Sequence, residues 1–368
     1  MAVYFPFDVT ERTFIIPSFF LRGDSMADSS SSSASYSPPD LHGKVALVAG
    51  ATRGVGRGIA LALGEAGATV YCTGRSTKAN RLPRSRSKRA SPFDHSRRPE
   101  TVEETAEMVT TRGGKGVAAV LDHTDTKQVE KLLARIRKQQ GKLHILVNDI
   151  SELIPQDFGK TFWQANLENG FANLRNVLHT HVITSHCSAP LLIETSAKSN
   201  SPGLIVEIGD GDSYSYRGHL FYDLTKTSVI RLAFAMAREL RRKNVAAVAL
   251  TPGFLRSEAM LESFGVTEAN WQDAVKKDPN YASSETPLYA GRAVAGLAAD
   301  PDIMKRSGRV FSSWGLSEEY TFCDSDGRRP HWGKHYKEKY GDTMNSCDEG
   351  FYKYWFGGAM DAVFGDWP

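Results

Sequence analysis

Residues 44–66 read KVALVAGATRGVGRGIALALGEA, and this stretch decides the fold. The apolar run VALVA is followed at once by Gly50, Gly54 and Gly56, and then by the apolar periodicity of a helix. In such a turn the first glycine allows a sharp bend, the second lets backbone approach a pyrophosphate, and the third lets the helix pack closely on the strand. Free N–H groups at the start of the helix bind phosphate. The stretch therefore predicts a dinucleotide-binding strand–loop–helix unit.

The alternation of short apolar runs with longer helical segments continues to about residue 316. Strands are predicted at Lys44–Ala49, Thr69–Thr73, Gly116–Leu121, His144–Asn148, Gly203–Ile208, Val245–Thr251 and Arg309–Ser312. Helices are predicted at Val55–Ala66, Val102–Arg112, Thr126–Gln140, Asn173–Ala197, Phe221–Lys243 and Leu288–Asp300. This order predicts an α/β chain: a single Rossmann-type, doubly wound domain over residues 41–316, with a seven-stranded parallel sheet.

Composition limits the class of protein. The chain has 368 residues and a formal net charge of +3, a basic excess too small for a dedicated nucleic-acid-binding protein. Its 4 cysteines form no CxxC pair, which predicts reduced thiols in a cytoplasmic compartment and no metal site. No apolar run approaches the ~20 residues of a membrane span. Residues 1–40 are expected to be a disordered leader that starts at Met1 or Met26 and leaves organelle targeting open.

Three further segments depart from the alternation. Residues 78–98 form a basic insert within the domain. Residues 257–286 carry no strand pattern and are expected to form an apolar lid over a substrate, or merely a surface helix pair. Residues 317–368 form an aromatic-rich C-terminal extension, which we expect to pack on the domain or on a partner subunit.

The end of the second predicted strand favours NADP over NAD. NAD sites usually place an acidic residue there to hold the ribose 2′-hydroxyl, whereas this chain has Arg75 and Ser76. Arg53, inside the glycine loop, is a second candidate for the 2′-phosphate, because a guanidinium binds phosphate through two hydrogen bonds. The alternative for both arginines is a solvated surface charge.

Polar residues also follow the third and fourth strands, where the cofactor should pass. Asp122 is placed to accept a hydrogen bond from the adenine amino group, or to serve as a turn or N-cap residue for the next helix, and His123 follows it. Asn148 lies at the cofactor ribose or ties neighbouring loops together. Thr52 and Val55 complete the predicted cofactor loop.

Tyr222 and Lys226 are the predicted chemical centre. Residues four apart on a helix share a face, so the phenol and the ammonium can point at one spot. An ammonium near a phenol stabilises phenolate and lowers the pKa of the tyrosine toward the working range of a general acid/base. The pair therefore predicts proton transfer at a substrate oxygen.

Taken in order, these motifs resemble the short-chain dehydrogenase/reductase family over roughly residues 41–317, closest to its dehydrogenase/reductase member 1 branch. Arg98–Thr101 and Ser283–Thr286 are suggestive of that branch. The resemblance implies an NADP(H)-dependent enzyme that interconverts a small-molecule carbonyl and an alcohol. Tyr222 would be the proton donor, and Lys226 would bind the nicotinamide ribose and tune the phenol. A homodimer or homotetramer is implied as well.

The resemblance assigns roles to several other residues. Asn176 would organise a proton-relay water. Ser257 would hold the nicotinamide carboxamide, and the backbone of Pro252, Gly253 and Leu255 would lie under the nicotinamide ring.

Two positions depart from the family pattern. Asp149 stands where the family has a second asparagine, and Asp210 stands where its catalytic serine should be. An ionised aspartate cannot donate a hydrogen bond to a carbonyl oxygen. Burial keeps Asp210 protonated and able to donate, or Ser213 reaches in from the same loop, or the protein is a cofactor-binding scaffold or redox sensor with weak or no catalysis. The intact Tyr–Lys pair favours an enzyme.

Overall fold

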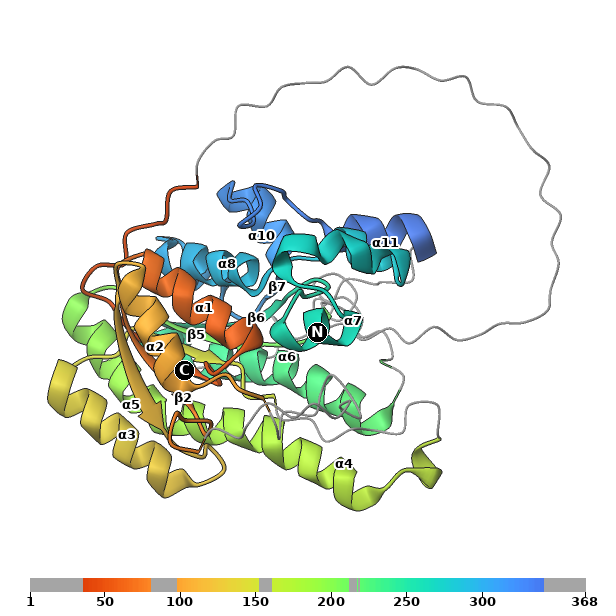
Figure 1. Cartoon of the computed structure of the whole chain (residues 1–368). Coiled ribbons are helices and arrows are strands. Elements are labelled where there is room, and N and C mark those ends of the chain that lie inside the picture. Colours follow the sequence, from red (N-terminus) through yellow and green to blue (C-terminus); the bar gives the residue numbers. More distant parts are fainter. Residues whose placement is uncertain (1–35, 81–97, 152–160, 212–216, 218, 341–368) are drawn as a thin grey trace, which may run out of the picture.

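The computed structural model describes residues 36–80, 98–151, 161–211, 217 and 219–340. Its sheet has seven strands, all parallel, in the order β3-β2-β1-β4-β5-β6-β7 (Figure 1). The strands are β1 (Val45–Ala49), β2 (Thr69–Gly74), β3 (Lys115–Val120), β4 (Ile145–Asn148), β5 (Gly203–Ile208), β6 (Val245–Thr251) and β7 (Val310–Ser312). The strand order reverses between β1 and β4, the position at which open α/β sheets bind ligands. The predicted fold class is confirmed.

Helices cover both faces of this sheet, as Figure 1 shows. One layer holds α1 (Gly54–Glu65), α2 (Val102–Thr111), α8 (Pro287–Ala299) and α9 (Ile303–Arg306), and the other holds α3 (Thr126–Gln140), α5 (Thr180–Ser199) and α6 (Leu220–Leu240). Successive strand residues point to opposite faces of a sheet. Ala46 and Val48 of β1 accordingly join the core under the first layer, and Val45 and Leu47 join the core under the second.

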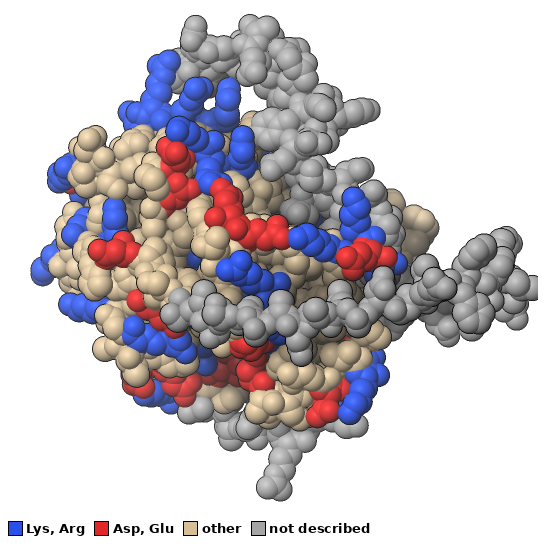
Figure 2. All heavy atoms as spheres, turned by 90° about the horizontal axis from the view of Figure 1, so that it is seen from above, with Lys and Arg blue, Asp and Glu red and all other residues tan. Residues whose placement is uncertain are grey.

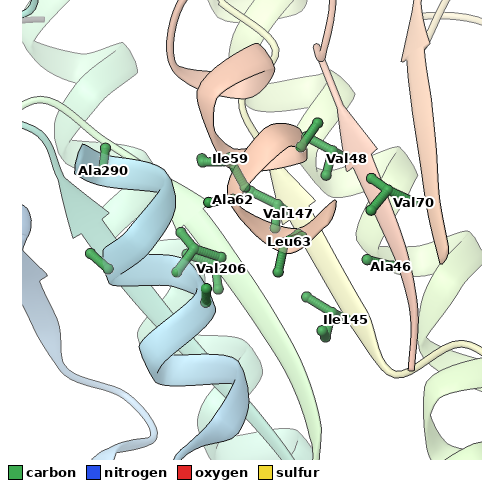
Figure 3. Close-up of a cluster of buried hydrophobic side chains, with 14 of the residues drawn as sticks. Ala46, Val48, Ile59, Ala62, Leu63, Val70, Ile145, Val147, Val206 and Ala290 are labelled. Atoms are coloured by element: carbon green, nitrogen blue, oxygen red, sulfur yellow. The ribbon is translucent and has the colours of Figure 1, made fainter. Parts of the chain in front are cut away.

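The core under the first layer holds α1 against the sheet. In Figure 3, Ile59, Ala62 and Leu63 of α1 lie among Val48 of β1 and Val147 of β4. All of these side chains are fully buried. Full burial of a valine, leucine or isoleucine contributes roughly 1.5–3 kcal/mol. The packing of α1 therefore positions the glycine loop that precedes it.

The helix predicted at Asn173–Ala197 is part of a longer one. The helix runs from α4 (Leu167–Leu174) through a π-helical turn at Arg175–His179 into α5. The predicted start was wrong because Asn166 caps the helix earlier: its side chain accepts a hydrogen bond from the N–H of Asn169.

A third hydrophobic cluster joins the predicted lid to the C-terminal extension. It includes Phe254, Trp271, Tyr281, Trp314 and Trp332. The elements that follow β6 and β7 are α7 (Glu258–Phe264), 3-10 segments at Glu268–Lys276 and Pro279–Ser283, α10 (Ser313–Tyr320) and α11 (Trp332–Tyr340). The helix α10 spans the predicted domain boundary at residue 316, and the extension packs on the domain through α11. The aromatic residues after 350 lie outside the described part.

Arg256 is the ion-pair centre of this module. Its guanidinium is buried and contacts carboxylate oxygens of Glu268 at 2.9 Å, Asp326 at 3.1 Å and Asp324 at 3.4 Å. The guanidinium carbon lies 4.5 Å from the ring centroid of Trp271. Arg256 therefore clasps the predicted lid to the extension.

We expect Arg256→Met to lower the free energy of unfolding by about 3–5 kcal/mol, since removing one partner of a buried ion pair leaves the other charges uncompensated. Chemical denaturation measures this loss. Arg137→Met is the matched control, because Arg137 pairs with Glu194 at the surface and its loss should cost less than about 1 kcal/mol. Equal losses in the two variants would contradict the clasp.

The charged side chains of the surface are mixed in sign. On the face drawn in Figure 2, basic and acidic side chains lie beside one another over much of the surface. Tyr36, within the predicted leader, packs against Phe322 with ring centroids 6.5 Å apart, and residues 1–35 lie outside the described part. The described residues contain no helix long and apolar enough to cross a bilayer. They also contain no group of three or more His, Cys, Asp or Glu that could hold a metal ion.

Candidate active site

A cavity of about 210 Å³ opens at the carboxyl ends of the central strands, where the strand order reverses. The predicted site residues that line it are Gly50, Thr52, Arg53, Gly54, Val55, Arg75, Ser76, Asp122, His123, Asn176, Tyr222, Lys226, Pro252, Leu255 and Ser257. The predicted site residues outside its lining are Gly56, Asn148, Asp210 and Gly253. The fold thus brings most of the predicted site to one place.

The glycine loop is shaped as its sequence requires. Gly50 and Gly54 have φ angles of +91° and +57°, in the left-handed region that favours glycine. A Cβ atom on Gly56 would lie 2.3 Å from the carbonyl oxygen of Gly50. A side chain at Gly56 would force α1 away from the loop, and one at Gly50 would lie 2.6 Å from the carbonyl oxygen of Asp149, so these two glycines allow the close packing of loop, helix and strand β4.

The arginines predicted for the 2′-phosphate both contact carboxylates. Arg53 donates to Ser76 Oγ at 3.0 Å and to Glu100 Oε2 at 3.2 Å. Arg75, whose side chain is half exposed, lies 3.8 Å from the carboxylate of Asp122. Two cations and a hydroxyl therefore stand at the cavity, with their charge partly balanced by neighbouring acids.

The described ends of the basic insert are ion-paired within the chain. Arg98 is buried and contacts Glu100 at 2.8 Å and Glu262 of α7 at 3.3 Å. Lys78 contacts Glu107 of α2 at 2.5 Å. Residues 81–97 lie outside the described part.

Asp122 and His123 organise the loop after β3. Asp122 Oδ1 accepts hydrogen bonds from the backbone N–H and the hydroxyl of Thr124 at 2.9 and 2.8 Å, which is the turn alternative. His123 lies between the hydroxyls of Thr73 and Thr184, each 2.8 Å away. Burial lowers the pKa of His123 to about 3, so this imidazole is neutral. Contact of Asp122 with adenine stays a prediction.

Asn148 and Gly253 have structural contacts. Asn148 Nδ2 donates to Ser185 Oγ at 2.8 Å and to Glu207 Oε1 at 2.7 Å, which ties β4 to a helix and a strand, α5 and β5, and not to neighbouring loops. A Cβ atom on Gly253 would lie 2.7 Å from Glu285 Oε2. Neither residue lines the cavity, so a role for either in cofactor binding stays a prediction.

Tyr222 and Lys226 lie one turn apart on α6, line the cavity and are 4% and 5% exposed. Lys226 Nζ is 6.0 Å from the ring centroid of Tyr222 and 3.3 Å from Ser151 Oγ, to which it donates. The hydroxyl of Tyr222 donates to the carboxylate of Asp210. The centre therefore contains a carboxylate as well as the predicted phenol and amine.

The pKa of Tyr222 is not lowered, which corrects the expectation from the sequence. Burial, and then the charge of Asp210 and its hydrogen bond, raise the pKa of Tyr222 well above its ordinary value. Burial lowers the pKa of Lys226, against the attraction of Asp210 and Asp149. Tyr222 is thus a protonated phenol whose proton points to Asp210.

Asp210 is buried and acts as an acceptor. Burial raises the pKa of its carboxyl, but positive charges that include Lys226 and Arg217 hold it below the ordinary value, and so does the hydrogen bond from Tyr222. A carboxylate in this state cannot donate to a substrate oxygen. Asp210 is thus an acceptor for Tyr222 in this structure, and its donation to a substrate oxygen stays a prediction. Ser213 lies outside the described residues.

Asn176 lies in the π-helical turn between α4 and α5 and lines the cavity together with Tyr222 and Lys226. Such turns inside α-helices are frequent at functional sites. The backbone carbonyl of Asn176 accepts a hydrogen bond from the hydroxyl of Thr180, also in the cavity wall, at 3.1 Å. Asn176 thus lies beside the Tyr–Lys pair in the cavity wall, and its role in proton relay stays a prediction.

Two acids contact the glycine loop that the sequence did not indicate as binding residues. Asp149 follows β4 and accepts a hydrogen bond from the N–H of Gly56, and burial raises the pKa of Asp149 to about 6. Glu258, the first residue of α7, accepts a hydrogen bond from the N–H of Gly54 at 2.8 Å. Asp149 had a signal in its place at a strand end. Glu258 had none, because a tertiary contact across 204 positions brings it to the loop.

Fold and site together define a nucleotide-binding oxidoreductase of the Rossmann type. Residues 92–265 match the family described as short chain dehydrogenase. Over 295 residues the chain is 34% identical to dehydrogenase/reductase SDR family member 1 of Homo sapiens and 33% identical to that of Mus musculus, and each alignment covers 78% of this chain and 85% of the relative. The chain therefore belongs to the short-chain dehydrogenase/reductase family. Membership does not favour the alternative of a non-catalytic scaffold.

Solved structures share the fold. A short chain dehydrogenase from Mycobacterium thermoresistibile has a TM-score of 0.62 at 19% identity and covers 80% of this chain and 93% of its own. A second, from Burkholderia cenocepacia J2315 in complex with NADP, has a TM-score of 0.55 at 20% identity, over 74% and 96% of the two chains. A third, from Mycobacterium paratuberculosis bound to NAD, has a TM-score of 0.55 at 22% identity, over 74% and 97%. Proteins of this fold thus bind either dinucleotide.

Proposed function

We propose that this protein is an NADP(H)-dependent oxidoreductase that interconverts a small-molecule carbonyl and an alcohol, with Tyr222 as general acid/base assisted by Lys226. One observation carries the proposal: the glycine loop and a buried Tyr–Lys pair line the same cavity. The glycines fit a dinucleotide because a Cβ atom at Gly56 would collide with the loop that must receive the phosphates.

Different residues around the cavity would bind different parts of the cofactor. The glycine loop and the N-terminus of α1 hold the diphosphate. Arg53, Arg75 and Ser76 hold the 2′-phosphate, since they stand together beyond the end of β2. Lys226 would hold the nicotinamide ribose, and Pro252, Leu255 and Ser257, which line the cavity, would lie against the nicotinamide. When bound, the cofactor supplies or accepts the hydride.

The side chains of this protein move the proton. Tyr222, a protonated phenol, donates its proton to the oxygen of a carbonyl substrate as that oxygen gains negative charge. In the reverse direction the phenolate form of Tyr222 accepts the proton of an alcohol. Lys226 supplies the positive charge that stabilises phenolate.

We also propose a homodimer or homotetramer that pairs through α4, α5 and α6. Leu167 and Phe171 of α4 and Leu224 of α6 support this, because their large apolar side chains are exposed. Burial of such side chains in an interface is favourable.

Titration of the protein with NADPH and with NADH, followed by nucleotide fluorescence, tests the cofactor. We expect NADPH to bind about tenfold or more tightly, because a phosphate held by two guanidinium groups contributes charge-assisted hydrogen bonds that NADH lacks. Arg75→Ala should remove most of this preference. Arg137→Ala, which removes an arginine from the surface of α3, should leave it intact. Equal affinities for the two nucleotides in the wild type would overturn the NADP assignment.

A further inference from the structure

An acidic side chain lies at the phosphate-binding end of the glycine loop. The carboxylate of Glu258 accepts the N–H of Gly54 at 2.8 Å and lies 3.5 Å from the guanidinium of Arg57. Gly54 is the first residue of α1, and its N–H is among those that have no partner within the helix. Glu258 also lines the cavity beside Arg53 and Val55 of the loop.

This contact places one anion where another must bind. The N–H groups at the start of α1 are the donors that the proposed function assigns to the diphosphate. A carboxylate on the same donor satisfies it in advance and repels a phosphate that approaches, since both carry negative charge. Glu258 therefore stands in the position of the cofactor's phosphate.

The carboxylate reaches the loop from a rigidly held element. Glu258 is two residues after Arg256, whose buried guanidinium is bound by Glu268, Asp324 and Asp326. The backbone N–H of Arg256 donates to the carbonyl of Glu285 at 2.7 Å. The first turn of α7 is thus anchored, so displacement of Glu258 takes place at its own side chain, which is 30% exposed at the cavity rim.

We propose that Glu258 is an affinity-determining residue of the nucleotide site, an internal competitor that the diphosphate of the dinucleotide displaces from the N–H of Gly54. The inference rests on the proposed function, because it needs a dinucleotide at the glycine loop. Displacement leaves Arg57 with its contacts to Glu104 at 3.6 Å and Thr105 at 3.0 Å, so this guanidinium keeps its place at the loop.

Isothermal titration of NADPH into the wild type, Glu258→Gln and Glu258→Ala tests the proposal. Glu258→Gln keeps the size of the side chain and removes its charge, and we expect its Kd to be about tenfold lower than that of the wild type, equivalent to ~1.4 kcal/mol. Glu258→Ala removes charge and acceptor together and should bind at least as tightly. Adenosine 2′-monophosphate, which lacks the diphosphate, should bind all three proteins equally.

Glu262→Gln is the matched control, because it removes the same charge one turn further along α7, where the carboxylate contacts Arg98 and not the loop. An unchanged or weaker Kd for NADPH in Glu258→Gln overturns the proposal while leaving the proposed function in place. An equal gain in affinity for NADPH in Glu262→Gln, or for adenosine 2′-monophosphate in Glu258→Gln, also overturns it. The gain would then come from a lower overall negative charge and not from the contact with Gly54. If no variant and no wild type binds NADPH, the proposed function and this inference both fall.

Discussion

Tyr222→Phe is expected to lower turnover of carbonyl and alcohol substrates about 1,000-fold, within the range for loss of a general acid/base. The change removes one oxygen atom, and with it the only proton that the proposed chemistry delivers to the substrate. The ring stays in its buried place on α6. Binding of NADPH should therefore stay within about twofold of the wild type, because the glycine loop and the arginines are unchanged. Change in NADPH absorbance across a panel of aldehydes, ketones and secondary alcohols measures the loss.

Tyr281→Phe is the matched control for this variant. Tyr281 is fully buried, lies outside the cavity lining, and its hydroxyl has no hydrogen-bond partner among the described residues. Its loss should leave turnover near the wild-type value. Full activity in Tyr222→Phe would show that another group moves the proton.

Asp210→Ser is expected to raise carbonyl reduction at neutral pH about 100-fold, the effect of one hydrogen-bond donor on a developing oxyanion. It should also shift the pH dependence of alcohol oxidation. The charge of Asp210 raises the pKa of Tyr222, so its removal lowers that pKa, and the phenolate that accepts a proton forms at lower pH. The rising limb of alcohol oxidation should therefore move toward lower pH.

Asp210→Ala separates the two effects, since alanine removes the charge without adding a donor. We expect it to move the pH profile as Asp210→Ser does, but not to reproduce the gain in carbonyl reduction. A pH profile that stays in place in both variants would show that Asp210 does not set the pKa of Tyr222.

The strands and crossover helices could be predicted from local pattern because each buries its own apolar face. The run at Val45–Ala49 and the helix at Thr126–Gln140 have that pattern and form as expected. The start of α4 could not be predicted in this way. Leu167 and Phe171 have the i, i+4 spacing of a helix face but do not join the core, and the cap at Asn166 decides the boundary.

In the site, too, local sequence pattern predicts some features and tertiary contacts decide the others. The loop glycines and the Tyr–Lys pair are close in sequence, so spacing alone indicated their geometry. The partners that set their chemistry come from elsewhere in the chain: Asp210 turns the phenol toward itself, and Glu258 reaches Gly54 from α7. The sequence predicts a lowered pKa for Tyr222, because Lys226 lies one turn away on the same face of the helix. In the structure the pKa of Tyr222 is raised, because burial and the carboxylate of Asp210 outweigh the effect of one ammonium.

The ion pairs of Arg256 make the C-terminal extension a support for one wall of the cavity. Ser257 and Glu258 follow Arg256 directly, so whatever fixes that guanidinium also fixes the wall they form. A fragment trimmed at residue 316 would lack Asp324 and Trp332, and the guanidinium would face a gap in an apolar setting. We therefore expect the shortest fragment that keeps the cavity wall intact to extend to the end of α11, well past β7, the last strand of the sheet.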